Sequence, residues 1–233
     1  MNVGNSGFVR ASGPRRLCAL LLLMASGAIA ATAQQAHPAL DAQLEHVDVA
    51  VSAVVELTPS SNGKNYLGQN VQNTPSTTVG VLGTVRYIKS PLVGVEFNYH
   101  YARYTENFTY TALNTSGPAT VLLGVQTNAT EYTFGYVAHT RGEHSGVQPF
   151  LAGGAGVIAF RPTKYGGQGY QPQARAAYYY AVGAERSYLN PHLGVRVQFR
   201  QVFHLAPDYE TNYLTTHHRA ISSEPTVGFY YHF

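Results

Sequence analysis

Charged side chains recur in this sequence at positions that alternate with apolar ones, and this spacing can gather them inside one enclosed space. Ionised groups removed from water are stable only when acids and bases pair. We therefore expect the acidic members of the set to pair with its three arginines and to fill the interior. Apart from Asp48, which shares the pattern, the predicted network consists of Glu56, Arg86, Glu96, Glu131, Glu185, Arg196 and Arg200.

Histidine and cysteine offer little support for a metal site. The chain has ten histidines and one cysteine, Cys18. His217 and His218 are adjacent, and neighbouring side chains on an extended backbone point in opposite directions. A metal site needs three or four convergent ligands. We expect neither a metal nor another cofactor.

The elements that must position these charges are strands. Apolar and polar residues alternate with period two over about ten residues, which is the pattern of a membrane-barrel strand. In the clearest case, Leu193, Val195, Val197 and Phe199 alternate with polar residues or glycine. In the Gly/Ala-rich segment 148–160 the two faces cannot be assigned. Eight such segments begin near residues 47, 79, 93, 131, 148, 178, 193 and 220, and the last of them ends in the alternating stretch 226–233.

The connections between the segments alternate between long and short. Short connections fall at 88–91, 141–146 and 189–191, whereas polar stretches that we expect to be loops cover 59–75, 106–123, 161–172 and 206–219. Outer-membrane barrels have long outer loops and short periplasmic turns. The sequence therefore predicts an all-β fold, a closed eight-stranded antiparallel up-and-down transmembrane barrel with four outer loops.

A bilayer explains why the charges are sorted so strictly to one face. A charge facing lipid at mid-depth costs about 2–4 kcal/mol, which is a large part of a typical folding stability of about 5–15 kcal/mol. The apolar face would meet outer-membrane lipid. In the final segment the residues on this face are Val227, Phe229, Tyr231 and Phe233.

The N-terminal residues have the features of a secretory signal peptide. Arg10, Arg15 and Arg16 precede the apolar run 17–25, and an A-x-A pattern ends at Ala33. We expect a cleaved signal peptide at 1–33, a short periplasmic segment at 34–45 and a barrel domain at 46–233. Three of the fifteen basic residues leave with the signal, so twelve basic and twelve acidic residues remain. This balance argues against nucleic acid as a partner.

The segments QPFLAGGAGVIAF, AVGAERSYLNPHLGVRVQFRQV and PTVGFYYHF resemble small outer-membrane barrels of the OmpA/OmpX/opacity-protein type. The resemblance covers about residues 45–233 and includes no peptidoglycan-binding domain, so a wall-anchoring role is not expected. It implies residence in the outer membrane of a Gram-negative-type bacterium. It also implies that the final strand, through Val227, Phe229, Tyr231 and Phe233, is the signal read by the barrel-assembly machinery.

Three functions remain open at this stage. By resemblance, the loops would serve adhesion, surface protection or envelope integrity, with a possible surface ligand. A narrow channel for small solutes would need an open interior. A lipid-modifying hydrolase similar to the lipid A deacylases would need a His-x-Ser pair, but His204 is followed two residues later by Ala206, which has no hydroxyl to activate. We therefore expect the protein not to be an enzyme.

Overall fold

The computed structural model describes residues 42–90, 92–114, 117–140, 146–190 and 192–233. The predicted signal peptide and most of the segment 34–45 lie outside these residues, as does most of the predicted turn 141–146. Residues Leu44–Phe233 form one compact unit. Its strands are β1 (Val47–Glu56), β2 (Ser61–Lys64), β3 (Asn70–Pro75), β4 (Thr78–Ser90), β5 (Val93–Asn114), β6 (Gly117–His139), β7 (Gln148–Pro162), β8 (Gln173–Asn190), β9 (Leu193–Leu205) and β10 (Arg219–His232).

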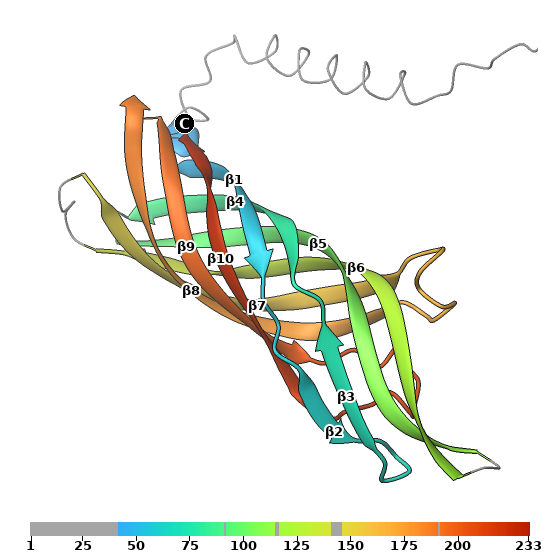
Figure 1. Cartoon of the computed structure of the whole chain (residues 1–233). Coiled ribbons are helices and arrows are strands. Elements are labelled where there is room, and N and C mark those ends of the chain that lie inside the picture. The colour runs from blue at the N-terminus through green and yellow to red at the C-terminus, as the bar shows by residue number, and fades with distance from the viewer. Residues whose placement is uncertain (1–41, 91, 115–116, 141–145, 191) are drawn as a thin grey trace, which may run out of the picture. The chain divides into compact units, whose positions relative to one another are not determined.

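Eight of these strands form a closed ring. β1 pairs with β4 on one side and with β10 on the other, and the remaining antiparallel pairs follow the chain from β4 through β5 to β10. Val51, for example, lies opposite Gly83 of β4 and Phe229 of β10. Closure pairs the backbone groups of the shared section and leaves no open edge there. The predicted eight-stranded antiparallel barrel is confirmed (Figure 1).

Along the ring strands, exposed apolar residues on the outer surface alternate with buried polar residues or glycine on the inside, as a membrane barrel requires. On β9, Val197 is 54% exposed on the outer surface, whereas Arg196 and Arg200 are each 1% exposed and point inward. Among the described residues, no helix is long and apolar enough to cross a membrane. The apolar side chains of the outer face, such as Val197 and Phe229, are exposed on the protein surface.

The structure assigns the faces of the Gly/Ala-rich strand β7, which the sequence left open. Phe150 and Ile158 point inward, and Leu151 and Val157 point outward. Gly156 occupies an inward position where an added Cβ would collide with the backbone of β6 at Tyr132. The close contact between β6 and β7 therefore depends on glycine.

Two of the four predicted loops contain strands. The stretch 59–75 holds the hairpin β2–β3, and β3 pairs with β5 between Val71–Tyr110 and Pro75–Glu106. The stretch 106–123 is mostly the continuation of β5 and β6, which run as one long hairpin past the end of the ring (Figure 1). The predicted loops at 161–172 and 206–219 agree with the structure, since β7 ends at Pro162 and β9 at Leu205.

The stretch 106–123 was predicted as a loop because the alternation of apolar and polar residues reverses at the outer end of β5, so that apolar residues face inward there instead of outward. Up to Tyr101, apolar side chains face outward; from Ala102 onward, the buried positions include Tyr104 and Phe108, whereas Arg103 is exposed. An outer face that meets water should be polar and an inner face should be apolar. The part of the barrel beyond the bilayer is therefore built like a soluble protein, with an apolar core inside.

Candidate functional site

The lumen, meaning the interior of the ring, contains two clusters of ion pairs. The cluster nearer the short turns is centred on Glu185 of β8. Its carboxylate accepts hydrogen bonds from Arg196 at 2.8 and 3.0 Å and from Arg86, which reaches across from β4, at 3.0 Å. Arg86 also donates to Glu96 at 2.8 Å, and His139 Nε2 lies 2.8 Å from Glu185. This cluster ties β4 and β5 to β6, β8 and β9 across the lumen.

The second cluster is a quartet that lies further toward the outer end. Arg200 of β9 bonds to Glu131 of β6 and, at 2.7 Å, to Glu224 of β10. His100 Nδ1 lies 3.8 Å from Glu224 and is the cross-strand neighbour of Glu131. Arg200 and the two carboxylates are each no more than 2% exposed. Four side chains from four strands thus close the barrel at this level.

Tyr179 links the two clusters. Its hydroxyl donates to Glu96 at 2.8 Å, and Asn98 donates to the same carboxylate at 2.9 Å. The guanidinium of Arg200 lies 4.6 Å from the centre of the Tyr179 ring. The clusters therefore form one continuous polar column, in which most hydrogen-bonding groups have a partner, as buried charges require.

Six of the seven residues of the predicted network join this column, and Glu56 forms no ion pair with any residue that the structure describes. Its Oε1 lies 3.5 Å from Ser222 Oγ, and its Oε2 has no hydrogen-bond partner among the described residues. Sequence reasoning missed Glu224, His100 and His139. The two histidines were on the polar faces of their strands, whereas Glu224 lay in the first part of the last strand, whose faces the sequence pattern left unassigned.

The quartet also brings three potential metal ligands together. Ligand atoms of His100, Glu131 and Glu224 lie within 4.8 Å of one another, and this is the single such group in the described part of the chain. The guanidinium of Arg200 already binds both carboxylates. A cation would have to displace or repel this positive charge, so the donor set suits an ion-pair network better than a metal ion.

The outer end of the barrel is covered by the loop 206–218, which is held in place by Asp208. Its Oδ1 accepts hydrogen bonds from Gln173 at 2.7 Å and from Arg175 at 2.9 Å, and its Oδ2 accepts one from Thr215 at 3.1 Å. Partial burial opposes ionisation, but the bond from Gln173 and the charge of Arg175 outweigh it and lower the pKa of Asp208. The charged carboxylate therefore anchors the loop.

Apolar and aromatic side chains seal the space beneath this loop. Tyr209 is 2% exposed, packs edge-on against Phe108 of β5 with ring centres 6.3 Å apart, and stacks on Tyr170 at 5.8 Å. Leu214 of the loop is fully buried in the same cluster. Tyr209 has a φ of 50°, an uncommon value for a residue with a side chain. The surrounding contacts therefore hold the loop in a strained, specific conformation.

His204, the candidate base of the hydrolase hypothesis, is also inside the barrel. It is 4% exposed and its ring lies 5.5 Å from that of Phe160. The residue two positions later is Ala206, which is itself buried. Nothing at this position supplies a nucleophile for His204 to activate.

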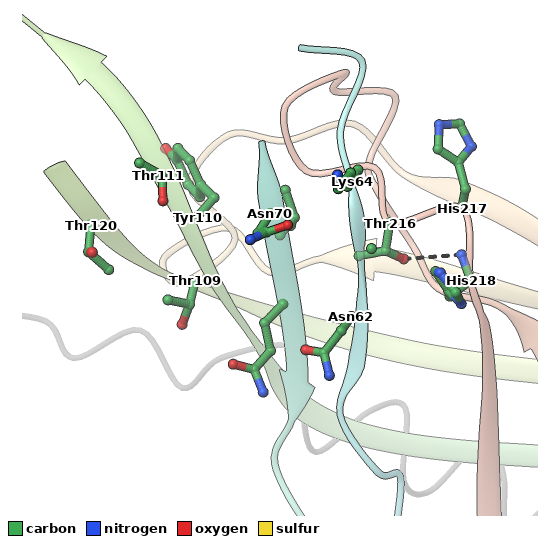
Figure 2. Close-up of a pocket in the computed structure, with 13 residues that line it drawn as sticks. Asn62, Lys64, Asn70, Thr109, Tyr110, Thr111, Thr120, Thr216, His217 and His218 are labelled. Atoms are coloured by element: carbon green, nitrogen blue, oxygen red, sulfur yellow. Dashed lines mark hydrogen bonds between the residues drawn. The ribbon is translucent and has the colours of Figure 1, made fainter. Parts of the chain in front are cut away.

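A polar groove of about 760 Å³ opens beside the loop at the same end of the molecule. Its walls come from the hairpin β2–β3, from the outer ends of β5 and β6, and from Thr216, His217 and His218 (Figure 2). Both histidines line it. The backbone of this pair is not extended as we had expected, because His217 has a left-handed φ of 57°.

The four residues of the predicted assembly signal lie on the outer face of β10 and at its end. Phe229 is the most exposed at 67%, followed by Val227, Tyr231 and Phe233. This placement suits contact with lipid during and after insertion. Their recognition by the assembly machinery stays a prediction.

Comparison with known proteins places this geometry in a family. Residues 17–221 match the family model described as outer membrane protein beta-barrel domain. The chain belongs to this family. Its location in the outer membrane follows from that membership. No curated protein matches the sequence itself.

Solved structures of the same fold share little sequence with this family member. OprG from Pseudomonas aeruginosa superposes with a TM-score of 0.52 at 15% identity, covering 80% of this chain and 95% of that one. Neisserial surface protein A (NspA) superposes with a TM-score of 0.50 at 11% identity, covering 81% and 97%. At such identities the likeness establishes the fold alone.

Proposed function

We propose that this protein is a non-conducting and non-catalytic scaffold that displays a folded outer surface to the environment of a Gram-negative-type cell. Adhesion or surface protection is the role that best uses such a surface. The observation that carries the proposal is closure at three levels: the Glu185 cluster, the Arg200 quartet and the aromatic cover around Tyr209.

The construction of the outer end supports display rather than transport. A pore for solutes needs a continuous aqueous path, whereas here an apolar core containing Phe108, Phe160 and Leu214 lies between the lumen charges and the outside. Loop 206–218 is bonded to β8 through Asp208, Gln173 and Arg175. The outer surface is therefore a fixed shape, which suits recognition better than a set of independent loops.

The absence of an expected catalytic pair supports a non-catalytic role. His204 has no hydroxyl or thiol neighbour at the position where the lipid-modifying hydrolases carry their serine, and it is packed among apolar groups. Incubation of the purified protein with lipid A should release no acyl chains. Release of acyl chains above a heat-denatured control would overturn this part of the proposal.

Conductance decides between a scaffold and a channel. The refolded protein, inserted into planar bilayers, should give no unitary current steps at potentials up to about 100 mV, where one charge gains only ~2.3 kcal/mol. Reproducible ohmic steps from the intact protein would contradict the proposal. A variant lacking residues 207–217 serves as the comparison, because its outer cover is disrupted while the buried ion pairs that stabilise the barrel are kept.

Adhesion needs its own measurement on cells. Cells that lack the protein should bind less to host or abiotic surfaces than cells that express it. Expression of the variant lacking residues 207–217 should fail to restore binding although the barrel still inserts. Equal binding by all three strains would contradict an adhesive role.

A further inference from the structure

We propose that the polar groove at the outer end binds an acidic saccharide, meaning a sugar chain that carries carboxylate, sulfate or phosphate groups. The proposal rests on the proposed function, since it names the chemistry that the displayed surface would recognise. The groove volume of about 760 Å³ falls within the range of ligand sites, about 300–1,000 Å³. Its open form suits a short oligosaccharide.

The groove presents hydrogen-bonding groups suited to sugar hydroxyls. Asn62 of β2 and Asn70 and Gln72 of β3 are exposed, and in the described part of the chain their side-chain amides have no protein partner. Each amide offers donors and an acceptor in one plane. Vicinal hydroxyls of a sugar present the complementary pair. Three threonines extend the lining along the opposite wall: Thr109, Thr111 and Thr120.

The charge of the lining favours an acidic sugar over a neutral one. Lys64 projects from β2, His217 and His218 border the same space (Figure 2), and none of the described lining residues carries a carboxylate. Asp208 lies in a neighbouring pocket that shares the two histidines, but its charge is met by Arg175 at 2.9 Å. An anionic group in the groove would therefore meet positive charge without a nearby competing acid.

The walls of the groove are held in fixed positions before any ligand arrives. Gly63 of β2 packs so closely on the backbone of Thr216 that a Cβ would collide with it. Asn65 closes the turn after β2 by accepting hydrogen bonds from the amides of Leu67 and Gln69 at 2.9 and 3.0 Å. Such contacts reduce the ordering cost of binding.

His217, in the lining of the groove, has a strained backbone conformation. Its backbone has a left-handed φ of 57°, both adjacent histidines line the groove, and the ring of His217 lies edge-on to that of Tyr66 at 5.1 Å. A non-glycine residue keeps such a strained conformation only where the surrounding structure enforces it. Here the enforced segment places two imidazole rings in the lining of the same groove as Lys64.

The test measures binding of labelled oligosaccharides of equal length to the full protein in detergent micelles. The probes are an oligogalacturonide, a sulfated oligosaccharide, a phosphorylated lipopolysaccharide core oligosaccharide and neutral dextran. At least one acidic probe should bind about tenfold more tightly than dextran, because a hydrogen bond to a charged group is worth about that factor. Preference for the phosphorylated core would place the source in the cell's own outer leaflet, and preference for the others would indicate a foreign glycan.

Two substitutions that each remove one positive charge distinguish binding in the groove from non-specific attraction of an acidic sugar to the protein surface. Lys64→Gln should weaken binding of the acidic probe about tenfold and leave dextran unchanged. Lys164→Gln removes the same charge from an exposed loop position outside the groove and should have no effect. Asn70→Ala with Gln72→Ala should weaken binding of every sugar. Heat-modifiable gel mobility confirms that each variant is folded.

Equal affinity for acidic and neutral probes, or equal losses from Lys64→Gln and Lys164→Gln, would overturn the proposal. Its failure is distinguishable from failure of the proposed function. A closed barrel that mediates adhesion without binding any acidic sugar would refute the saccharide site alone. A conducting barrel would refute the scaffold role regardless of sugar binding.

Discussion

Replacement of Arg200 by methionine should destabilise the barrel severely. Arg200 is the sole arginine bound to Glu131 and Glu224 within the described ion pairs, and both carboxylates are at least 98% removed from solvent. Removing one partner of a buried ion pair leaves an uncompensated charge and costs about 3–5 kcal/mol. For a protein with a typical stability of about 5–15 kcal/mol, this is a large fraction of the total.

The loss can be measured by urea titration of the protein in lipid vesicles, with folded and unfolded forms separated by gel mobility. The chain has 18 tyrosines and no tryptophan, so tyrosine emission provides a second signal. Arg219→Met, at an exposed position at the start of β10, is the matched control and should change stability by less than about 0.5 kcal/mol.

A second variant tests whether the loss comes from unpaired charge. Combining Arg200→Met with Glu131→Gln and Glu224→Gln removes all three charges, and with them the cost of leaving two buried carboxylates without a partner. Most of the lost stability should therefore return. A loss below about 1 kcal/mol for Arg200→Met, or no recovery in the triple variant, would show that the quartet does not stabilise the barrel as argued.

Three further predictions address the lipid face, the outer cover and assembly. Val227→Lys, placed opposite Ala53 near the centre of β1, should cost about 2–4 kcal/mol in vesicles, whereas Asn212→Lys in the outer loop should cost almost nothing. Because the pKa of Asp208 is lowered in the folded protein, its carboxylate anchors the loop fully above the ordinary pKa of about 3.9 and ceases to do so as the pH falls through the lower folded-state pKa. Hydrogen exchange of loop amides 206–218 should therefore accelerate below about pH 4. Asp208→Asn should abolish this pH dependence. Phe233→Ala should reduce outer-membrane insertion in cells but leave refolding in detergent unchanged; equal loss in both would indicate a defect of stability rather than of recognition.

The ring of strands could be predicted because lipid and lumen differ sharply. Along β9, each outward position is apolar and each inward position is polar or glycine from Leu193 to Arg200, so the alternation itself encodes the two environments. The outer parts of β5 and β6 could not be found in this way. Beyond Tyr101 the inner face of β5 is apolar except for the buried Glu106, and the outer face is polar. A search for strands with apolar residues on the outer face therefore interprets this stretch as a loop.

The membership of the lumen network could also be predicted to a large extent, but its pairing could not. Side chains that face inward on known strands must share the lumen, whereas the partner of each acid depends on strand register and on reach across the barrel. Arg86 binds both its cross-strand neighbour Glu96 and the distant Glu185. The groove is lined mainly by strands in stretches that the sequence predicted as loops, and by His217, whose left-handed backbone no local sequence signal indicates.

Spin labels on single-cysteine variants along β9 test most directly whether hydrocarbon surrounds the barrel and polar groups fill it. Labels are placed one at a time at 195, 197, 198 and 199 in protein reconstituted into vesicles, which leaves the buried arginines in place, with no competing cysteine after the predicted signal peptide. Collision with oxygen should be high at positions 195, 197 and 199 and low at the inward position 198. High collision with a water-soluble nickel complex at Val197 and Phe199 would contradict the account.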